Sequence, residues 1–335
     1  MEMQYFKEYS PALGREMECK IYGHGGRPML YIPCQDGRFF DFEDFHMADT
    51  LAPWIESGQI MVLSIDTLDK ETWSDTNGDP YWRIRRYEQW LRYIVDEAVP
   101  KLRYLSKERN GWDDLPGVIA FGCSLGATHA GISVGEDGAT HQCLEDIGLM
   151  RTIPGMVVLS PADAVEARAA VEAAILHDGP VYLRFGRLAV PQVFDRDTYQ
   201  FTLGKGICVK EGSDATIIAT GLMLFEAIDA AEQLSKEGIS ARVIDIHTIK
   251  PIDRDIIVKA AQETGCIVTA EEHNIFCGLG SAVAEVLVEN APVPMERIGV
   301  KDVYGRSGKP AELLKYYNMT ADDIAAAVKK VMKRK

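Results

Sequence analysis

Apolar and polar positions alternate at short spacing in several stretches of the first third of the chain. Residues 17–22, 28–32, 60–65 and 118–121 are apolar or alternating runs bounded by Gly, Pro or Asp, a pattern typical of β-strands. Residues 41–55 and 83–104 instead carry apolar side chains at helical spacing. The apolar residues that we expect to share one face of the second helix are Ile84, Tyr87, Trp90, Leu91, Ile94 and Val95.

A regular alternation of strand and helix follows in the rest of the chain. The pattern predicts strands at 156–159, 181–185, 215–220, 242–246, 266–271 and 295–300, and helices at 164–177, 222–237, 253–264 and 278–290. Alternating elements of this length predict a mostly parallel sheet that helices cover on both faces.

The composition changes abruptly between these two regions. Residues 1–127 hold 19 of the 29 aromatic residues, including all five tryptophans, which indicates two parts of different origin. The net charge of -14 argues against a nucleic-acid partner. The sequence has no signal peptide pattern and no apolar run of about 20 residues that could span a membrane. Seven cysteines without a C-x-x-C pair favour reduced thiols and a cytoplasmic location.

A nucleophile-elbow pattern follows the predicted strand at 118–121. Gly122-Cys123-Ser124-Leu125-Gly126 has the form G-x-S-x-G, in which a strained turn exposes the serine hydroxyl. With this strand, residues 5 to about 129 resemble the N-terminal part of an esterase of the α/β-hydrolase family, and Ser124 is the candidate nucleophile. Three glycines soon after the elbow should end the helix that such an enzyme needs there.

The segment that follows the elbow has a second resemblance. Thr128-His129-Ala130-Gly131 and the run Gly135 to Gln142 (GEDGATHQ) are followed by Ile153 to Asp163 (IPGMVVLSPAD). From about residue 128 to the C-terminus the chain resembles the C-terminal section of transketolase. This implies an α/β fold with three parts: a truncated α/β-hydrolase sheet (1–127), the latter part of a pyrimidine-binding domain (128–203) and a transketolase C-terminal domain (204–335).

The transketolase resemblance also implies roles for four residues. His129 would contact a substrate phosphate or hydroxyl, and Asp137 would bind a sugar hydroxyl. His141 is the candidate for proton transfer, since an imidazole titrates near neutral pH. Arg187 would bind a sugar phosphate through its planar guanidinium.

The same resemblance implies thiamine diphosphate and Mg²⁺ as cofactors. In the family, a glutamate and an aromatic residue ahead of the Thr-His loop hold the aminopyrimidine, but esterase-like sequence stands there in this chain. Asn77-Gly78-Asp79-Pro80 departs from the family's metal-binding element because a proline replaces a glycine and no binding helix is expected after it. We therefore expect that the chain alone neither retains the cofactor nor is active.

The implied partners are sugar-phosphate substrates, a separate transketolase N-terminal subunit, and a second copy bound through the C-terminal domain, with no membrane contact. Two alternatives stay open: a serine esterase that uses Ser124, and a non-catalytic assembly subunit. The shared segment Ala127 to Ala130 is where the sequence predicts that the two parts were joined, by recombination or in sequence assembly.

Overall fold

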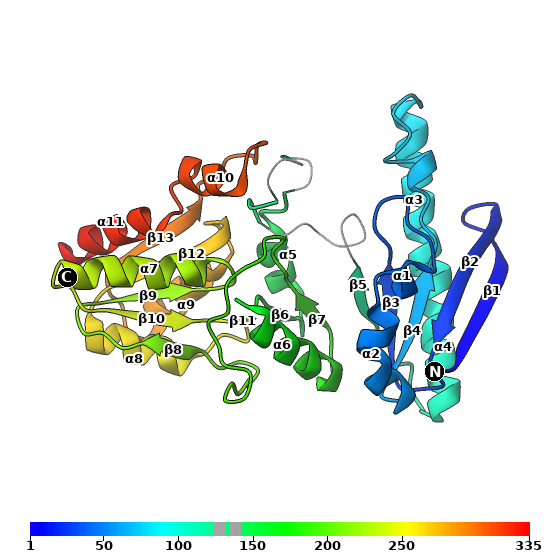
Figure 1. Cartoon of the computed structure of the whole chain (residues 1–335), viewed down its shortest axis with the longest axis horizontal. Helices are drawn as coiled ribbons and strands as arrows, with labels where there is room; N and C mark the ends of the chain where they lie inside the picture. The colour runs from blue at the N-terminus through cyan, green and yellow to red at the C-terminus, as the bar shows by residue number, and fades with distance from the viewer. Residues whose placement is uncertain (123–130, 135–137, 139–141) are drawn as a thin grey trace. The chain divides into compact units, whose positions relative to one another are not determined.

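The computed structural model of the protein describes residues 1–122, 131–134, 138 and 142–335. The chain forms two compact units, Met1–Thr128 and His129–Lys335 (Figure 1). Each unit has a hydrophobic core of its own. The predicted boundaries at 127/128 and 203/204 stay predictions.

The first unit is built on a five-stranded mixed sheet with the order β1-β2-β4-β3-β5. Its strands are β1 (Met3–Ser10), β2 (Arg15–Tyr22), β3 (Arg27–Ile32), β4 (Ile60–Ile65) and β5 (Ile119–Gly122). Strands β3, β4 and β5 are parallel, whereas β1 and β2 run antiparallel to their neighbours. Every residue of β4 is buried, as expected for the central strand of a sheet with both faces covered.

Helices pack on this sheet from the connections between its strands. They are α1 (Asp41–Asp44), α2 (Met47–Glu56), the 3₁₀-helix η1 (Asp69–Glu71), α3 (Pro80–Arg92), the π-helix η2 (Tyr93–Ala98) and α4 (Val99–Asn110). The helix predicted at 41–55 is two helices, because His46 has a left-handed backbone conformation with φ of 55°. The helix predicted at 83–104 begins earlier, at Pro80, where the Asp79 carboxylate accepts the Trp82 N–H and caps α3.

The predicted single apolar face at 84–95 is also wrong. Trp90 and Ile94 are buried in the core, but Ile84, Leu91 and Val95 are exposed. The backbone changes from α-helix to π-helix at Tyr93, and the wider π turn shifts the angular position of every later side chain. Spacing counted on a uniform α-helix therefore assigns Val95 to the wrong face, whereas Ile84 and Leu91 precede the π-helix and their exposure has another cause.

The second unit contains a five-stranded and a three-stranded sheet. The larger sheet has the order β13-β12-β9-β10-β8, and the smaller has the order β11-β6-β7. The strands are β6 (Val157–Leu159), β7 (Val181–Leu183), β8 (Ile207–Lys210), β9 (Ala215–Ala219), β10 (Ala241–Asp245), β11 (Thr248–Lys250), β12 (Ile267–Asn274) and β13 (Met295–Val300). Four strands of the larger sheet are parallel, as predicted, and β8 runs antiparallel at its edge.

Helices cover both faces of the larger sheet (Figure 1). Helices α7 (Met223–Lys236) and α11 (Ala321–Met332) bury their apolar sides on one face, and α8 (Arg254–Thr264) and α9 (Leu279–Asn290) on the other. The remaining helices are α5 (Asp146–Thr152), α6 (Ala164–Leu176) and α10 (Pro310–Tyr316). Within the part of the chain that the structure describes, no helix is both long enough and apolar enough to cross a membrane.

We expect the two units to unfold separately, because each has its own core. Ile217 lies fully buried in the middle of β9, so Ile217→Ala should lower the free energy of unfolding of the second unit by about 2–5 kcal/mol. All five tryptophans lie in the first unit. In urea unfolding, Ile217→Ala should move the circular dichroism transition and leave the tryptophan fluorescence transition in place.

Leu63→Ala, in the core of the first unit, is the matched control and should move the fluorescence transition. A shift of the tryptophan fluorescence transition in Ile217→Ala would show that the units unfold together.

Candidate functional site

The structure describes one of the five site residues that the sequence predicts. Ser124, His129, Asp137 and His141 lie outside the described residues. Arg187 follows β7, and its guanidinium Nη1 donates to the carbonyl of Val134 at 3.0 Å. Arg187 therefore contacts the segment that carries the other predicted transketolase residues.

The described ends of that segment are tied to each other. The N–H of Gly131 donates to the carbonyl of Cys143 at 2.9 Å, and the Gln142 side-chain amide donates to the carbonyl of Ile132 at 3.0 Å. We call residues 128–142 the site loop. Its described residues Ile132, Ser133 and Val134 are buried, and Ile132 belongs to the core on the α7 and α11 face.

A buried ion pair lies directly behind the site loop. Arg184 at the end of β7 and Asp146 at the start of α5 are almost fully buried, and Arg184 Nε lies 2.7 Å from Asp146 Oδ2. The Tyr182 hydroxyl also donates to Asp146 Oδ2, at 2.8 Å. Burial by itself would raise the pKa of Asp146, but the adjacent guanidinium outweighs it and the pKa is lowered. Asp146 is therefore ionised, and the pair is charge-balanced.

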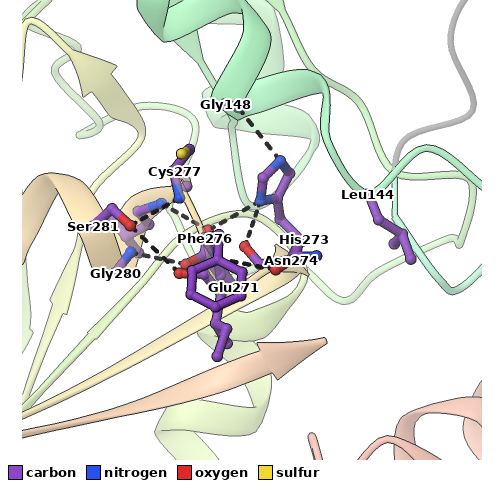
Figure 2. A network of polar contacts seen from close by, with 12 residues as sticks. Leu144, Gly148, Glu271, His273, Asn274, Phe276, Cys277, Gly280 and Ser281 are labelled. Atoms are coloured by element: carbon purple, nitrogen blue, oxygen red, sulfur yellow. Dashed lines mark hydrogen bonds and ion pairs between the residues drawn. The ribbon is translucent and has the colours of Figure 1, made fainter. Parts of the chain in front are cut away.

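His273 at the end of β12 lies beside this pair as a neutral imidazole, with its Nε2 4.0 Å from Asp146 Oδ1. Figure 2 shows its hydrogen bonds. The N–H of Gly148 donates to its Nε2 at 3.4 Å, which requires the proton to be on Nδ1. Nδ1–H then donates to the carbonyl of Asn274 at 2.7 Å. Burial, assisted by the Arg184 charge, lowers the pKa of His273. The imidazole thus has a structural role at neutral pH.

Glu271, also on β12, caps helix α9 (Figure 2). Its carboxylate oxygens accept the backbone N–H groups of Leu279 at 2.7 Å and Gly280 at 2.8 Å. Burial raises the pKa of Glu271 to about 7, although these two N–H donors favour the ionised form. A fully buried carboxyl that titrates near neutral pH makes the stability of this region depend on pH.

A second group of buried acids lies at the end of β6. Asp163 caps α6 by accepting the Glu166 N–H at 2.9 Å, and it also accepts the N–H groups of Val193 and Phe194. Burial raises the pKa of Glu166, and burial next to Glu166 raises the pKa of Asp245 well above its ordinary value. This group fixes the loop that follows β7.

Each buried glutamate of the described second unit already has a hydrogen-bond partner within the protein. The three buried glutamates of the second unit are all engaged: Glu166 with the Ala162 N–H, Glu271 with α9 and Glu272 with the Ser133 N–H. None of them is open to an aminopyrimidine ring. Within residues 1–122, 131–134, 138 and 142–335, no cluster of three or more His, Cys, Asp or Glu could hold a metal ion. We therefore derive no step through thiamine diphosphate in this chain alone.

Comparisons with known proteins identify the second unit. The model of the transketolase pyrimidine-binding domain matches residues 120–192, and the model of the transketolase C-terminal domain matches residues 204–324. The putative transketolase C-terminal section of Methanocaldococcus jannaschii is 43% identical over 228 residues, which are 67% of this chain and 71% of that protein. The chain belongs to the transketolase family. Transketolase-family homologues use thiamine diphosphate.

Two further relatives are named as a transketolase subunit and as a split gene transketolase. The 6-deoxy-6-sulfo-D-fructose transketolase subunit SqwH of Clostridium sp. (strain MSTE9) is 44% identical over 61% of this chain, which spans 63% of the relative's length. The solved structure of a split gene transketolase, an inactive beta4 tetramer, is 49% identical, with a TM-score of 0.57, and the match covers 62% of this chain and 66% of that one.

The esterase resemblance of residues 1–127 has no such support. Neither matched family is a hydrolase, and the pyrimidine-binding match begins at Ala120. The five residues of the predicted elbow, Gly122 to Gly126, therefore lie inside a transketolase domain match.

Four residues of the candidate site are not among those that the sequence predicts: Asp146, Arg184, Glu271 and Glu272. The only signal was the acidic pair Glu271-Glu272 at the end of an otherwise apolar strand. A buried acid in such a strand needs a partner, but the sequence does not say which one.

Glu271 should make the second unit less stable as the pH rises. Its pKa is about 7 in the folded chain and 4.5 ordinarily, so the folded state binds more protons in that window. The free energy of unfolding should fall by about 3 kcal/mol as the pH rises from 4.5 through 7. In Glu271→Gln, the free energy of unfolding, measured by circular dichroism in urea, should no longer show this fall with pH.

Below its ordinary pKa of 6.5, His273 makes the free energy of unfolding rise with pH. His273 is present in the wild-type protein and in Glu271→Gln, so this contribution cancels when the two are compared. Glu285→Gln, at an exposed ion pair with Arg151, is the control and should keep the wild-type slope. An unchanged slope in Glu271→Gln would refute the assignment.

Proposed function

We propose that this chain is the C-terminal subunit of a split transketolase. Together with a separate subunit that binds thiamine diphosphate and Mg²⁺, it transfers a two-carbon ketol unit between sugar phosphates. The observation that carries the proposal is the packing of the site loop: Arg187 and the buried Arg184–Asp146 network hold it against the C-terminal domain. The 49% identity to a split-gene transketolase supports the same assignment.

In this proposal the chain supplies substrate-binding and proton-transfer groups. Arg187 binds the phosphate of the sugar, since a guanidinium presents parallel N–H donors to two phosphate oxygens. His129 and Asp137 contact the sugar, and His141 moves a proton at the reacting carbons. Arg187 lies on a loop that follows strand β7, where α/β proteins place their sites.

The cofactor comes from the partner subunit. The pyrimidine-binding match covers only residues 120–192, and no buried glutamate of the described second unit is free to contact the cofactor ring. The chain alone should therefore be inactive. The solved split-gene relative, which is an inactive beta4 tetramer, supports this part of the proposal.

Reconstitution tests the proposed function. The chain alone should show no ketol transfer and no micromolar binding of thiamine diphosphate by calorimetry. Mixed with an N-terminal subunit of a split transketolase, thiamine diphosphate and Mg²⁺, it should transfer ketol units from fructose 6-phosphate. In the mixture, Arg187→Ala should raise the KM for the sugar phosphate about 10- to 100-fold, because it removes a charge-assisted hydrogen bond.

Arg196→Ala removes an exposed arginine nearby in sequence and should leave the KM unchanged. Ketol transfer or micromolar cofactor binding by the isolated chain would overturn the need for a partner. Loss of activity without a change in KM in Arg187→Ala would overturn the role of Arg187.

A further inference from the structure

We infer that Glu272, on strand β12 of the C-terminal domain, is a positioning residue that sets the conformation of the site loop. This inference rests on the proposed function, because that function gives the loop its role in substrate binding. The C-terminal domain would thereby take part in forming the substrate site as well as in assembly.

The contact between Glu272 and the loop is direct and buried. The side chain of Glu272 is 3% exposed, and its Oε1 accepts the backbone N–H of Ser133. The N–H of Ile132 also faces this carboxylate. Two successive N–H groups directed at one anion define a tight concave turn, so the carboxylate determines the local backbone of the loop.

Gly131 shows how closely the loop approaches Glu272. Its φ is +85°, and a Cβ at this position would lie 2.3 Å from Cδ of Glu272. A side chain is excluded both by the backbone conformation and by the carboxylate. The loop and the strand are therefore fitted to each other at this point.

Glu272 is itself held in place by groups on other elements. Its carbonyl accepts a hydrogen bond from Arg184 Nη2 at 2.9 Å, and Arg184 is paired with Asp146. The N–H of Asn274, two residues further along β12, donates to the carbonyl of Leu144 at 2.9 Å. The end of β12 that carries Glu272 is thus held by Arg184 and by the backbone of Leu144.

The loop residues held by Glu272 lie between the predicted substrate-binding residues. His129 precedes Gly131 by two residues, and Asp137 follows Val134 by three. Arg187 contacts the same segment through the Val134 carbonyl. A change in the conformation of residues 131–134 would therefore alter the spacing between Arg187 and the loop's substrate contacts.

The neighbouring glutamate provides a matched control. Glu271 and Glu272 are consecutive on one strand, so their side chains point to opposite faces. Glu271 binds the first N–H groups of α9, whereas Glu272 binds the site loop. The same chemical change one residue apart should therefore affect two different segments.

Amide hydrogen exchange measured by mass spectrometry tests this assignment on the full chain without requiring activity. Glu272→Gln replaces one carboxylate oxygen by an NH₂ donor that faces other N–H donors. Exchange in peptides that contain residues 131–134 should become about ten-fold faster or more. Peptides that contain residues 279–282 should change little. Glu271→Gln should give the reverse pattern.

Gly131→Ala disturbs the same contact from the loop. If Glu272→Gln does not fold, this variant still shows whether the contact sets the conformation of residues 131–134. It should also accelerate exchange at residues 131–134. Unchanged exchange there in either folded variant would overturn the inference.

The reconstituted enzyme separates positioning from general stability. Glu272→Gln should raise the KM for fructose 6-phosphate about ten-fold with a smaller fall in kcat, since the affected loop contacts substrate. Glu272→Asp, which keeps the charge, should restore part of the loss. An unchanged KM alongside faster loop exchange would overturn the positioning role. Failure of the wild-type mixture to transfer ketol units would count against the proposed function. The exchange results would still show whether Glu272 sets the conformation of residues 131–134.

Discussion

The second unit depends on one buried cation, the guanidinium of Arg184. It bonds the Asp146 carboxylate on α5, the Glu272 carbonyl on β12 and the Cys143 carbonyl next to the site loop. A buried charge is costly unless its partners are all in place, so these three segments have to be assembled together. A lysine could not replace Arg184, because an ammonium group lacks the planar fork of donors that reaches several acceptors at once. Arg184 thus holds the pyrimidine-binding region against the C-terminal domain together with the pairing of β11 with β6.

Much of the second unit could be predicted from the periodicity of apolar residues. The predicted helix at 222–237 is α7 (Met223–Lys236), and the predicted strand at 156–159 is β6 (Val157–Leu159). These elements have strong local signals because one or both faces are buried. Strand β1 was missed, since seven of its eight residues are exposed or only partly buried and show no alternation. The π-helix was missed because no local signal marks where an α-helix widens.

The candidate site was harder to predict because its contacts are distant in sequence. Glu272 meets Ser133, 139 residues away, and Arg184 meets Glu272, 88 residues away. A residue type indicates what a side chain can bind, but its partner depends on the fold. The esterase prediction fails for the same reason, because a local motif does not show whether its distant partner residues are present. Five residues around Ser124 match a nucleophile-elbow pattern. Such a serine is catalytic only when the fold brings an acid and a base from other parts of the chain next to it. The transketolase resemblance, in contrast, extended over two domain matches.

The carboxylate of Glu271 has a further consequence for helix α9. The start of a helix with glycines, such as Gly278-Leu279-Gly280, attracts phosphate groups because its free N–H groups and dipole favour an anion. Here the protein's own carboxylate occupies that position, and its attachment to the chain gives it a high effective concentration. A dissolved phosphate or nucleotide would have to displace a tethered competitor. Glu271 therefore makes this helix start selective against external anions.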